Sequence, residues 1–208
     1  MRYRALRVLV FLGACLPLAI WVYQGLGDGL GADPGKTLVD RLGVTALIFL
    51  LITLAMTPLR ALSGWGGWIA LRRQLGLWSF AYAFLHVAGY AFFLLALDTG
   101  QLLKDLSERP YIIVGALAWS CLFCLALTSN RFSIRRLGKR WKRLHRLIYP
   151  AVGLALLHML WIVRSDLGEW TLYTAIATAL LLVRFPPLAT ALERHAKRRH
   201  STISKKVE

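Results

Sequence analysis

Three histidines lie within or beside long apolar stretches of this 208-residue chain. His86 stands in the middle of one stretch, His145 lies at the start of another, and His158 follows in that same stretch. Ionisable side chains are costly inside a bilayer and usually mark a function there. His195 and His200 belong to a basic segment near the C-terminus, and we interpret them as solvated. His86, His145 and His158 are therefore the candidates for chemistry.

His86 and His158 are predicted to lie at a similar depth if their helices run in the same direction. At a rise of about 1.5 Å per residue, His86 lies ~16 Å beyond Leu75 and His158 lies ~20 Å beyond His145. Two imidazoles at one depth on neighbouring helices can bind haem iron from both sides, which favours electron transfer over oxygen chemistry. Spacing alone leaves two alternatives open, a hydrogen-bonding bridge between helices and a proton or substrate pathway.

Small residues accompany both histidines at helical spacing, and we expect them to leave room beside the two rings. They stand three residues before and after His86, and three and seven residues before His158: Ala83, Gly89, Ala155 and Ala151.

The elements that position these histidines are predicted to be membrane-spanning helices. Hydrophobic residues make up 57% of the chain, and its mean hydropathy is +0.55. A helix needs about 20 apolar residues to cross a bilayer, and only helices or closed barrels satisfy their backbone groups in lipid. The apolar runs are continuous rather than alternating, which favours helices. Six runs stand out: Val8–Tyr23, Leu42–Thr57, Leu75–Leu97, Tyr111–Thr128, Leu147–Val163 and Trp170–Phe185.

We therefore predict an all-α, polytopic bundle of about six transmembrane helices. The bundle forms one domain over residues 1–187, and residues 188–208 form a basic tail. Pro58, Pro110 and Pro186 are predicted to mark helix ends, because proline cannot continue a hydrogen-bonded helix.

The distribution of charge predicts the topology. Of the 26 lysines and arginines, 21 fall on the side that holds the N-terminus and five fall on the other side. That other side also holds 8 of the 10 acids. Basic residues concentrate on the cytoplasmic side of membrane proteins, so both termini are predicted to be cytoplasmic. The net charge of +16 is thus explained by topology and contact with anionic lipid rather than by nucleic-acid binding. The five outer residues are Lys36, Arg41, Lys104, Arg109 and Arg164.

Several stretches of the chain resemble the haem-binding membrane subunits of bacterial methionine sulfoxide reductase systems, the MsrQ family. This family belongs to the wider ferric-reductase-like transmembrane group, which includes the NADPH oxidases. The resemblance covers nearly the whole chain up to about Pro187. It is carried by Gly29-Leu30-Gly31-Ala32-Asp33-Pro34, by Leu71-Arg72-Arg73-Gln74-Leu75-Gly76-Leu77-Trp78 with Leu85-His86, and by Leu137-Gly138-Lys139-Arg140-Trp141 through Leu144-His145-Arg146-Leu147 and Tyr149 to His158.

The resemblance implies an electron carrier of the bacterial inner membrane. It implies haem b as the cofactor, with FMN also associated, and it matches His86, His145 and His158 to the family's histidines. Electrons would come from a cytoplasmic flavin reductase or the quinone pool. They would reach MsrP, a periplasmic molybdopterin enzyme that reduces methionine sulfoxide in oxidised proteins. The chain would act as an electron-transfer subunit without a substrate site of its own.

One position departs from the wider group, whose two-haem members carry two histidines about fourteen residues apart on the third helix. Fourteen residues before His86 stands Arg72. His145 and His158 are 13 residues apart, so at ~100° per residue they point ~140° apart on an ideal helix, although Pro150 between them could re-aim one. We therefore expect haem between His86 and His158.

His145 is then left near Arg72 and Arg73 on the inner side. This basic corner could hold haem propionates, a second haem or a flavin phosphate, because arginine binds such anions well. Its simpler interpretation is ordinary positive loop charge.

Two other functions remain as alternatives to an electron-transfer subunit. A self-standing ferric-chelate or quinone reductase would be active without a periplasmic partner. A haem-free proton relay or scaffold would use His86 and His158 without binding haem.

Overall fold

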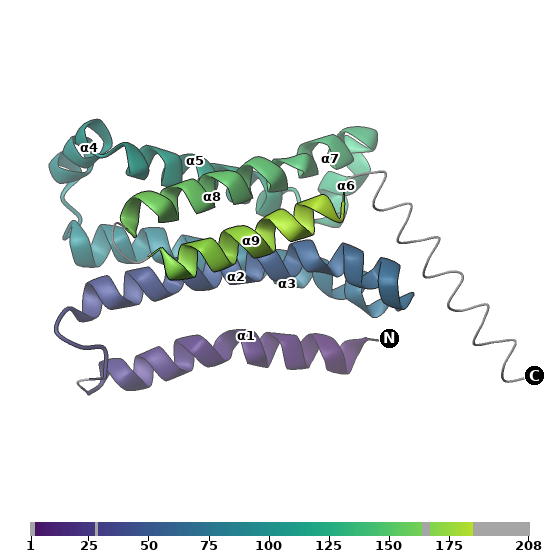
Figure 1. The fold of residues 1–208 in the computed structure, drawn as a ribbon, viewed down its shortest axis with the longest axis horizontal. Helices are drawn as coiled ribbons and strands as arrows, with labels where there is room; N and C mark the ends of the chain where they lie inside the picture. The colour runs from purple at the N-terminus through teal and green to yellow at the C-terminus, as the bar shows by residue number, and fades with distance from the viewer. Residues whose placement is uncertain (1–2, 28, 164–166, 185–208) are drawn as a thin grey trace, which may run out of the picture.

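The computed structural model describes residues 3–27, 29–163 and 167–184. Throughout these ranges the regular structure is helical, with no strand (Figure 1). The prediction of an all-α bundle is therefore confirmed. Eleven helical segments are described, with the following bounds: α1 Arg4–Gly25, α2 Pro34–Ser63, α3 Gly67–Gly89, the π-helical turn η1 Tyr90–Leu94, α4 Thr99–Glu108, α5 Pro110–Leu127, α6 Arg131–Leu137, α7 Lys139–Leu144, the 3-10 turn η2 His145–Leu147, α8 Ile148–Ile162 and α9 Gly168–Leu182.

Five of the six predicted segments yield helices long and apolar enough to cross a membrane. These spans are Arg4–Gly25, Pro34–Ser63, Gly67–Leu94, Pro110–Leu127 and Lys139–Ile162. The sixth segment forms α9, whose described length is 15 residues. The chain is thus a multi-pass membrane protein. Pro186 and the tail 188–208 lie outside the described residues.

The prediction that Pro58 ends a helix is wrong, because α2 continues past it to Ser63. The helix begins at Pro34, where the side chain of Asp33 accepts a hydrogen bond from the backbone N–H of Lys36 at 2.9 Å, a standard N-terminal cap. It ends at Gly64, whose φ of +70° suits glycine at a helix C-terminus. Pro58 has no N–H to bond the carbonyl of Leu54. Instead, that carbonyl accepts a hydrogen bond from Arg184 at 2.5 Å.

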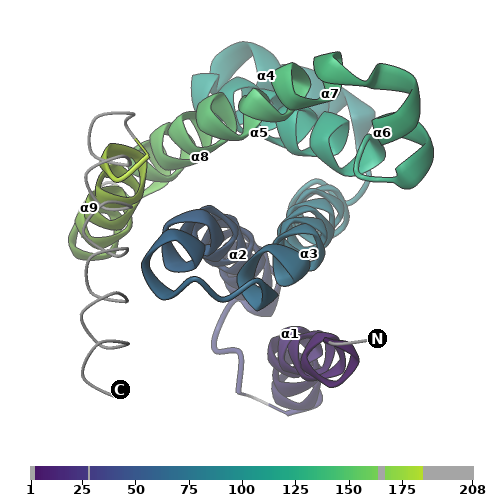
Figure 2. The ribbon, with the colours of Figure 1, turned by 90° about the vertical axis from the view of Figure 1, so that its right-hand side faces the viewer.

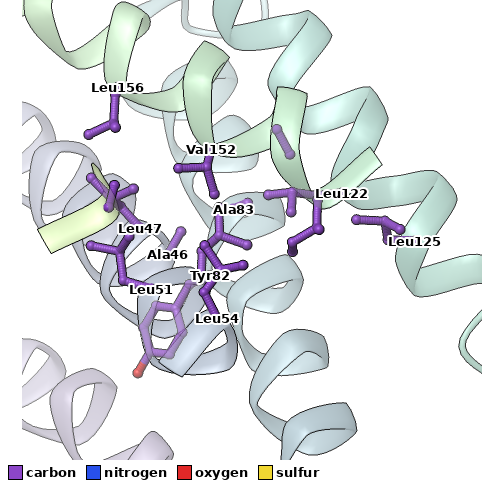
Figure 3. Packing of buried hydrophobic residues seen from close by; sticks show 14 of the residues in the cluster. Ala46, Leu47, Leu51, Leu54, Tyr82, Ala83, Leu122, Leu125, Val152 and Leu156 are labelled. Atoms are coloured by element: carbon purple, nitrogen blue, oxygen red, sulfur yellow. The ribbon is translucent and has the colours of Figure 1, made fainter. Parts of the chain in front are cut away.

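Two helical hairpins form the centre of the molecule. One pairs α2 with α3, and the other pairs α5 with α8 across the short helices α6 and α7. Figure 2 shows the α2–α3 pair between α1 on one side and the α5–α8 layer on the other, with α9 beside α2. Figure 3 shows side chains from both hairpins meeting in one core, including Leu51, Tyr82, Leu122 and Val152.

Buried polar bonds fix the spacing of the first three helices. The hydroxyl of Ser79 on α3 donates to the carbonyl of Ala46 on α2 at 2.9 Å. The hydroxyl of Tyr82, also on α3, donates to the carbonyl of Ala14 on α1 at 2.5 Å. Both side chains are fully buried, so these bonds satisfy groups that would otherwise be costly to bury.

The two ends of the bundle collect different connections. One end holds the start of α1, the α2–α3 junction, the α6–α7 segment and the end of α9, while the opposite end holds the α1–α2 connection, α4 and the start of α9 (Figure 1). This alternation matches the sides assigned from charge, so we call the first the basic end and the second the acidic end. Every acid in the described residues belongs to the acidic end: Asp33, Asp40, Asp98, Asp105, Glu108 and Glu169.

Candidate functional site

His86 on α3 and His158 on α8 face each other between the two hairpins. Their ring centroids are 6.2 Å apart, and the ring planes are nearly perpendicular at 85°. The expectation that these two residues share one depth is therefore confirmed. We call them the histidine pair.

Each ring of the histidine pair is held by a backbone carbonyl on the other helix of its own hairpin. Nδ1 of His86 lies 2.8 Å from the carbonyl oxygen of Val39 on α2. Nδ1 of His158 lies 2.7 Å from the carbonyl oxygen of Tyr111 on α5. A carbonyl only accepts, so Nδ1 carries the proton and donates in both rings. This bond fixes the tautomer and leaves each Nε2 with a lone pair for a metal.

A glycine makes room for each ring. A Cβ added at Gly43 would lie 2.9 Å from Nδ1 of His86, and a Cβ added at Gly115 would lie 2.8 Å from Cε1 of His158. Real Cβ atoms do not approach other atoms so closely. The two rings are therefore packed against the backbone of α2 and α5.

These contacts repeat at a constant offset along the chain. Each histidine stands 47 residues after the residue whose carbonyl it contacts. The residues of the second hairpin follow their counterparts in the first by 72 positions in each case: Tyr111 follows Val39, Gly115 follows Gly43 and His158 follows His86. The α2–α3 and α5–α8 hairpins thus present their histidines in the same way, from opposite sides of one space.

The geometry of the histidine pair fits an iron between two axial imidazoles. A metal lies about 2 Å from an imidazole nitrogen, so an ion between two such nitrogens separates the ring centroids by about 6 Å. The observed separation is 6.2 Å. Because both Nδ1 atoms are already bonded to carbonyls, Nε2 is the atom each ring has left for a metal.

Most of the small residues singled out in the sequence do not serve to make this space. A Cβ at Gly89 would meet Val39 on α2 at 3.2 Å, and Ala83 and Ala151 are buried within the hydrophobic core. They permit close contact between helices. The glycines that adjoin the rings are Gly43 on α2 and Gly115 on α5. Because they lie on other helices than the histidines, helical spacing from His86 or His158 does not predict them.

His145 lies apart from the histidine pair, at the basic end. Its ring stacks on Trp141 with centroids 3.8 Å apart. Its Nε2 lies 3.5 Å from the hydroxyl oxygen of Ser129. Arg72 is half-buried and donates to the hydroxyl of Thr57 at 3.2 Å, whereas Arg73 is exposed. The structure therefore brings His145 and Arg72 to the same end but does not join them to the pair.

Near the acidic end, the histidine pair adjoins an open cavity of about 680 Å³, lined by Glu108, Arg109, Pro110, Tyr111, Leu160 and Trp161. The ring of Tyr111 lies 6.2 Å from that of His158, so the cavity reaches the edge of the site. Tyr111 and then Asp105 raise the pKa of Arg109 above its ordinary value, which keeps this guanidinium charged.

Comparison with known proteins identifies the family. Residues 42–156 match the family model described as "Ferric reductase like transmembrane component". The chain is 46% identical over 183 residues to the "Protein-methionine-sulfoxide reductase heme-binding subunit MsrQ" of Xanthomonas euvesicatoria pv. vesicatoria (strain 85-10), an alignment that covers 85% of this chain and 84% of that protein. No solved structure matches the chain. The chain therefore belongs to the ferric-reductase-like transmembrane family and, within it, to the MsrQ family.

Proposed function

We propose that this chain is a haem b membrane subunit that passes electrons across the bacterial inner membrane. The observation that carries the proposal is the histidine pair, whose ring separation of 6.2 Å suits an iron held between the two rings. The related protein is named a heme-binding subunit of a protein-methionine-sulfoxide reductase, which supports the same assignment. His86 and His158 are the proposed axial ligands.

The residues around the pair tune such a site for electron transfer. Haem supplies reversible one-electron chemistry when bound. The carbonyls of Val39 and Tyr111 orient the rings and raise their basicity through the Nδ1–H hydrogen bonds. With both iron ligands supplied by the protein, the site would favour electron transfer over oxygen chemistry. Both rings are half-buried between the two helical hairpins.

The donor and acceptor are proposed from the family. Electrons enter at the basic end, facing the cytoplasm with both termini, from a flavin reductase or the quinone pool. They leave at the acidic end toward a periplasmic molybdopterin methionine sulfoxide reductase of the MsrP type. The system would then repair oxidised periplasmic proteins. Residues 1–187 form the proposed haem-binding domain and residues 188–208 its cytoplasmic tail.

A second cofactor position is proposed at the basic end, around His145, Arg72 and Arg73. The family resemblance associates FMN with such subunits, and haem propionates or a second haem would suit the same charges. His145 has its Nδ1 directed to the carbonyl of Trp141 at 3.2 Å, as the ligands of the pair have theirs directed to Val39 and Tyr111.

A proton relay through the histidine pair is disfavoured by the same hydrogen bonds. A relay passes a proton between the two nitrogens of each ring, but each Nδ1 is tied to a carbonyl that cannot donate. A self-standing ferric-chelate or quinone reductase is the remaining alternative, and it differs in needing no periplasmic partner.

The test of haem ligation is a dithionite-reduced-minus-oxidised visible spectrum of the purified chain. His86→Ala and His158→Ala are compared with the parent, and His195→Ala serves as the matched control. We expect a sharp b-type α-band in the parent and the control, and its loss in both variants. A parent without the band, after expression with haem supplied, would exclude the electron-carrier function.

The test of the electron path uses the reduced chain in vesicles with a purified periplasmic molybdopterin reductase and a methionine sulfoxide peptide. We expect the α-band to decay fully only when the molybdopterin reductase and the methionine sulfoxide peptide are both present. Equal decay with ferric citrate alone would favour the self-standing reductase.

A further inference from the structure

The basic end holds two guanidinium groups that share one hydroxyl group. Arg72 on α3 donates from Nη1 to Oγ1 of Thr57 on α2 at 3.2 Å. Arg184, just after α9, donates from Nη2 to the same oxygen at 3.2 Å and to the carbonyl of Leu54 at 2.5 Å. We call Arg72, Arg184 and Thr57 the arginine cluster. It ties three helices together at one point.

The charges of this cluster are not balanced by the described part of the chain. All acids in residues 3–27, 29–163 and 167–184 belong to the acidic end. Arg72 and Arg184 are instead close enough to repel each other. Partly buried cations inside a membrane segment are costly unless an anion pairs with them. An anion that binds both groups would remove this cost.

The cluster also has unused hydrogen-bonding capacity. Nε of Arg184 is buried and has no hydrogen-bond partner in the structure. A guanidinium has five N–H donors in a planar fork that suits the oxygens of a phosphate or carboxylate. The bonds to neutral Thr57 and Leu54 use two of the donors of Arg184 at most.

The surroundings of the cluster combine this charge with apolar surface. Leu182 at the end of α9 stands two residues before Arg184 and is exposed. Tyr149 on α8 is also exposed and lies close enough to Arg72 to interact electrostatically. A ligand with an anionic head and apolar tails would meet both kinds of surface. Basic pockets between helices at the cytoplasmic face are typical sites for lipid headgroups.

We propose that the arginine cluster binds the phosphate group of an anionic phospholipid between α2, α3 and the end of α9. The two guanidinium groups hold the phosphate oxygens, and the acyl chains lie along the exposed apolar side chains. This site goes beyond the proposed haem function, because it requires neither haem nor the histidine pair. It shares Arg72 with the second cofactor position proposed above, and the FMN arm of the test distinguishes the two ligands. In the sequence, Arg184 is only one of the basic residues that indicate topology, and this proposal assigns it a ligand.

The test compares lipid retention and lipid-dependent stability in the full-length chain. The parent, Arg72→Gln and Arg184→Gln are placed in nanodiscs of phosphatidylcholine alone or with one-fifth phosphatidylglycerol, and thermal unfolding is followed. Arg60→Gln is the matched control, because Arg60 is an exposed arginine near the same end of α2. We expect phosphatidylglycerol to raise the unfolding temperature of the parent and the control, and both cluster variants to lose most of that rise.

Native mass spectrometry of the detergent-purified proteins gives the second readout. We expect the parent to retain phosphatidylglycerol and the cluster variants to retain it with affinity lower by on the order of tenfold, the value of one charge-assisted hydrogen bond. Arg184→Lys keeps the positive charge but loses the planar guanidinium group, and it should retain an intermediate amount of phosphatidylglycerol. If Arg184→Gln fails to fold, Arg72→Gln and Arg184→Lys still decide the outcome.

Further arms distinguish the sources of a phosphate group. Inorganic phosphate and FMN are each added to delipidated protein in detergent. A stabilisation by either that matches phosphatidylglycerol, and that Arg72→Gln removes, would overturn the lipid assignment in favour of that ligand. An equal phosphatidylglycerol effect in the parent and both cluster variants would overturn the site altogether. The haem α-band is recorded in parallel. Arg184→Gln should give the same spectrum as the parent, so the lipid site and the haem site are tested separately.

Discussion

Each ring of the histidine pair is confined by one hydrogen bond and one glycine. Gly43 and Gly115 stand where any larger side chain would meet the ring at 2.9 and 2.8 Å respectively. An imidazole that must move away from such a contact also loses its carbonyl partner. The orientation of both rings is therefore set by the partner helices α2 and α5.

Gly43→Ala and Gly115→Ala are expected to weaken haem retention. Each added methyl group overlaps a histidine ring, and overpacking of this kind costs about 1–3 kcal/mol. The haem-to-protein ratio and the position of the α-band measure the effect. Gly153→Ala is the control, because a Cβ there meets nothing within 4 Å. Full haem content in both test variants would show that the rings tolerate displacement.

At the residue scale, the sequence identifies His86 and His158 because ionisable groups in apolar runs are conspicuous. Their partners could not be found in this way. Val39 and Tyr111 contribute backbone carbonyls, which any residue type would supply. Arg184 is indistinguishable in sequence from the basic residues that set topology. The common offset of 72 residues is the one signal that pairs Gly43 with Gly115, and it is meaningful only once the hairpins are known.

Helix α4 lies between two of the predicted apolar segments, and its attachment depends on one buried carboxylate. Asp105 is 2% exposed. It accepts hydrogen bonds from the hydroxyl of Tyr90, from Gln101 at 2.9 Å and from Arg109 at 3.4 Å. The side chain of Asp98 begins the helix by accepting from the N–H groups of residues 100 and 101. The acidic end thus contains a surface helix that is tied through Asp105 to Tyr90 on η1.

Asp105→Ala is expected to loosen α4 and to leave Tyr90 without its acceptor. The loss of a hydrogen-bonded charged group of this kind costs about 1–3 kcal/mol. Hydrogen exchange should speed up across residues 99–108, and the thermal midpoint should fall. Glu108→Gln, at an exposed position of the same helix, should change neither. Unchanged exchange in Asp105→Ala would mean that α4 is held by apolar contacts instead.

The first helix depends on fewer contacts, and one of them is the bond from Tyr82 to the carbonyl of Ala14. Tyr82→Phe should cost about 1 kcal/mol, the usual value of one hydrogen bond, because the carbonyl of Ala14 loses this partner. Faster exchange confined to α1 would identify the change. Tyr23→Phe provides the comparison, since Tyr23 is 80% exposed. A fall in stability that is equal in the two variants would contradict this role for Tyr82.

At the element scale, each of the six predicted apolar segments forms a helix and five of them are long enough to cross a membrane, but several of the predicted ends are wrong. Pro58 was expected to stop a helix, and it does not, because Arg184 supplies a hydrogen bond to the carbonyl that the proline leaves free. That donor comes from a residue 130 positions away, so no local pattern predicts it. Helices α4, α6 and α7 are short and lie in charged stretches, where hydropathy gives no signal.

The molecule as a whole separates basic from acidic connections at its two ends. We expect the acidic end to face the periplasm, because basic residues are retained on the cytoplasmic side during insertion. Leu103→Cys on α4 and Phe132→Cys on α6 place a thiol at positions that are 69% and 68% exposed. In a background without the three native cysteines, an impermeant maleimide added to spheroplasts should label the first and not the second. Labelling of Phe132→Cys alone would reverse the topology.

The 72-residue offset between the hairpins has a consequence for biogenesis. The α2–α3 hairpin enters the membrane with one member of the histidine pair, and the other member is supplied only after α8 has been synthesised. If the pair ligates haem, neither half alone retains it, so insertion of the cofactor must follow that of nearly the whole chain. Val39 and Gly43, which position the ring of His86, belong to this same hairpin. Haem would then join the two hairpins only at a late stage of synthesis. A nascent chain stalled before α8 should contain a folded α2–α3 hairpin that does not bind haem.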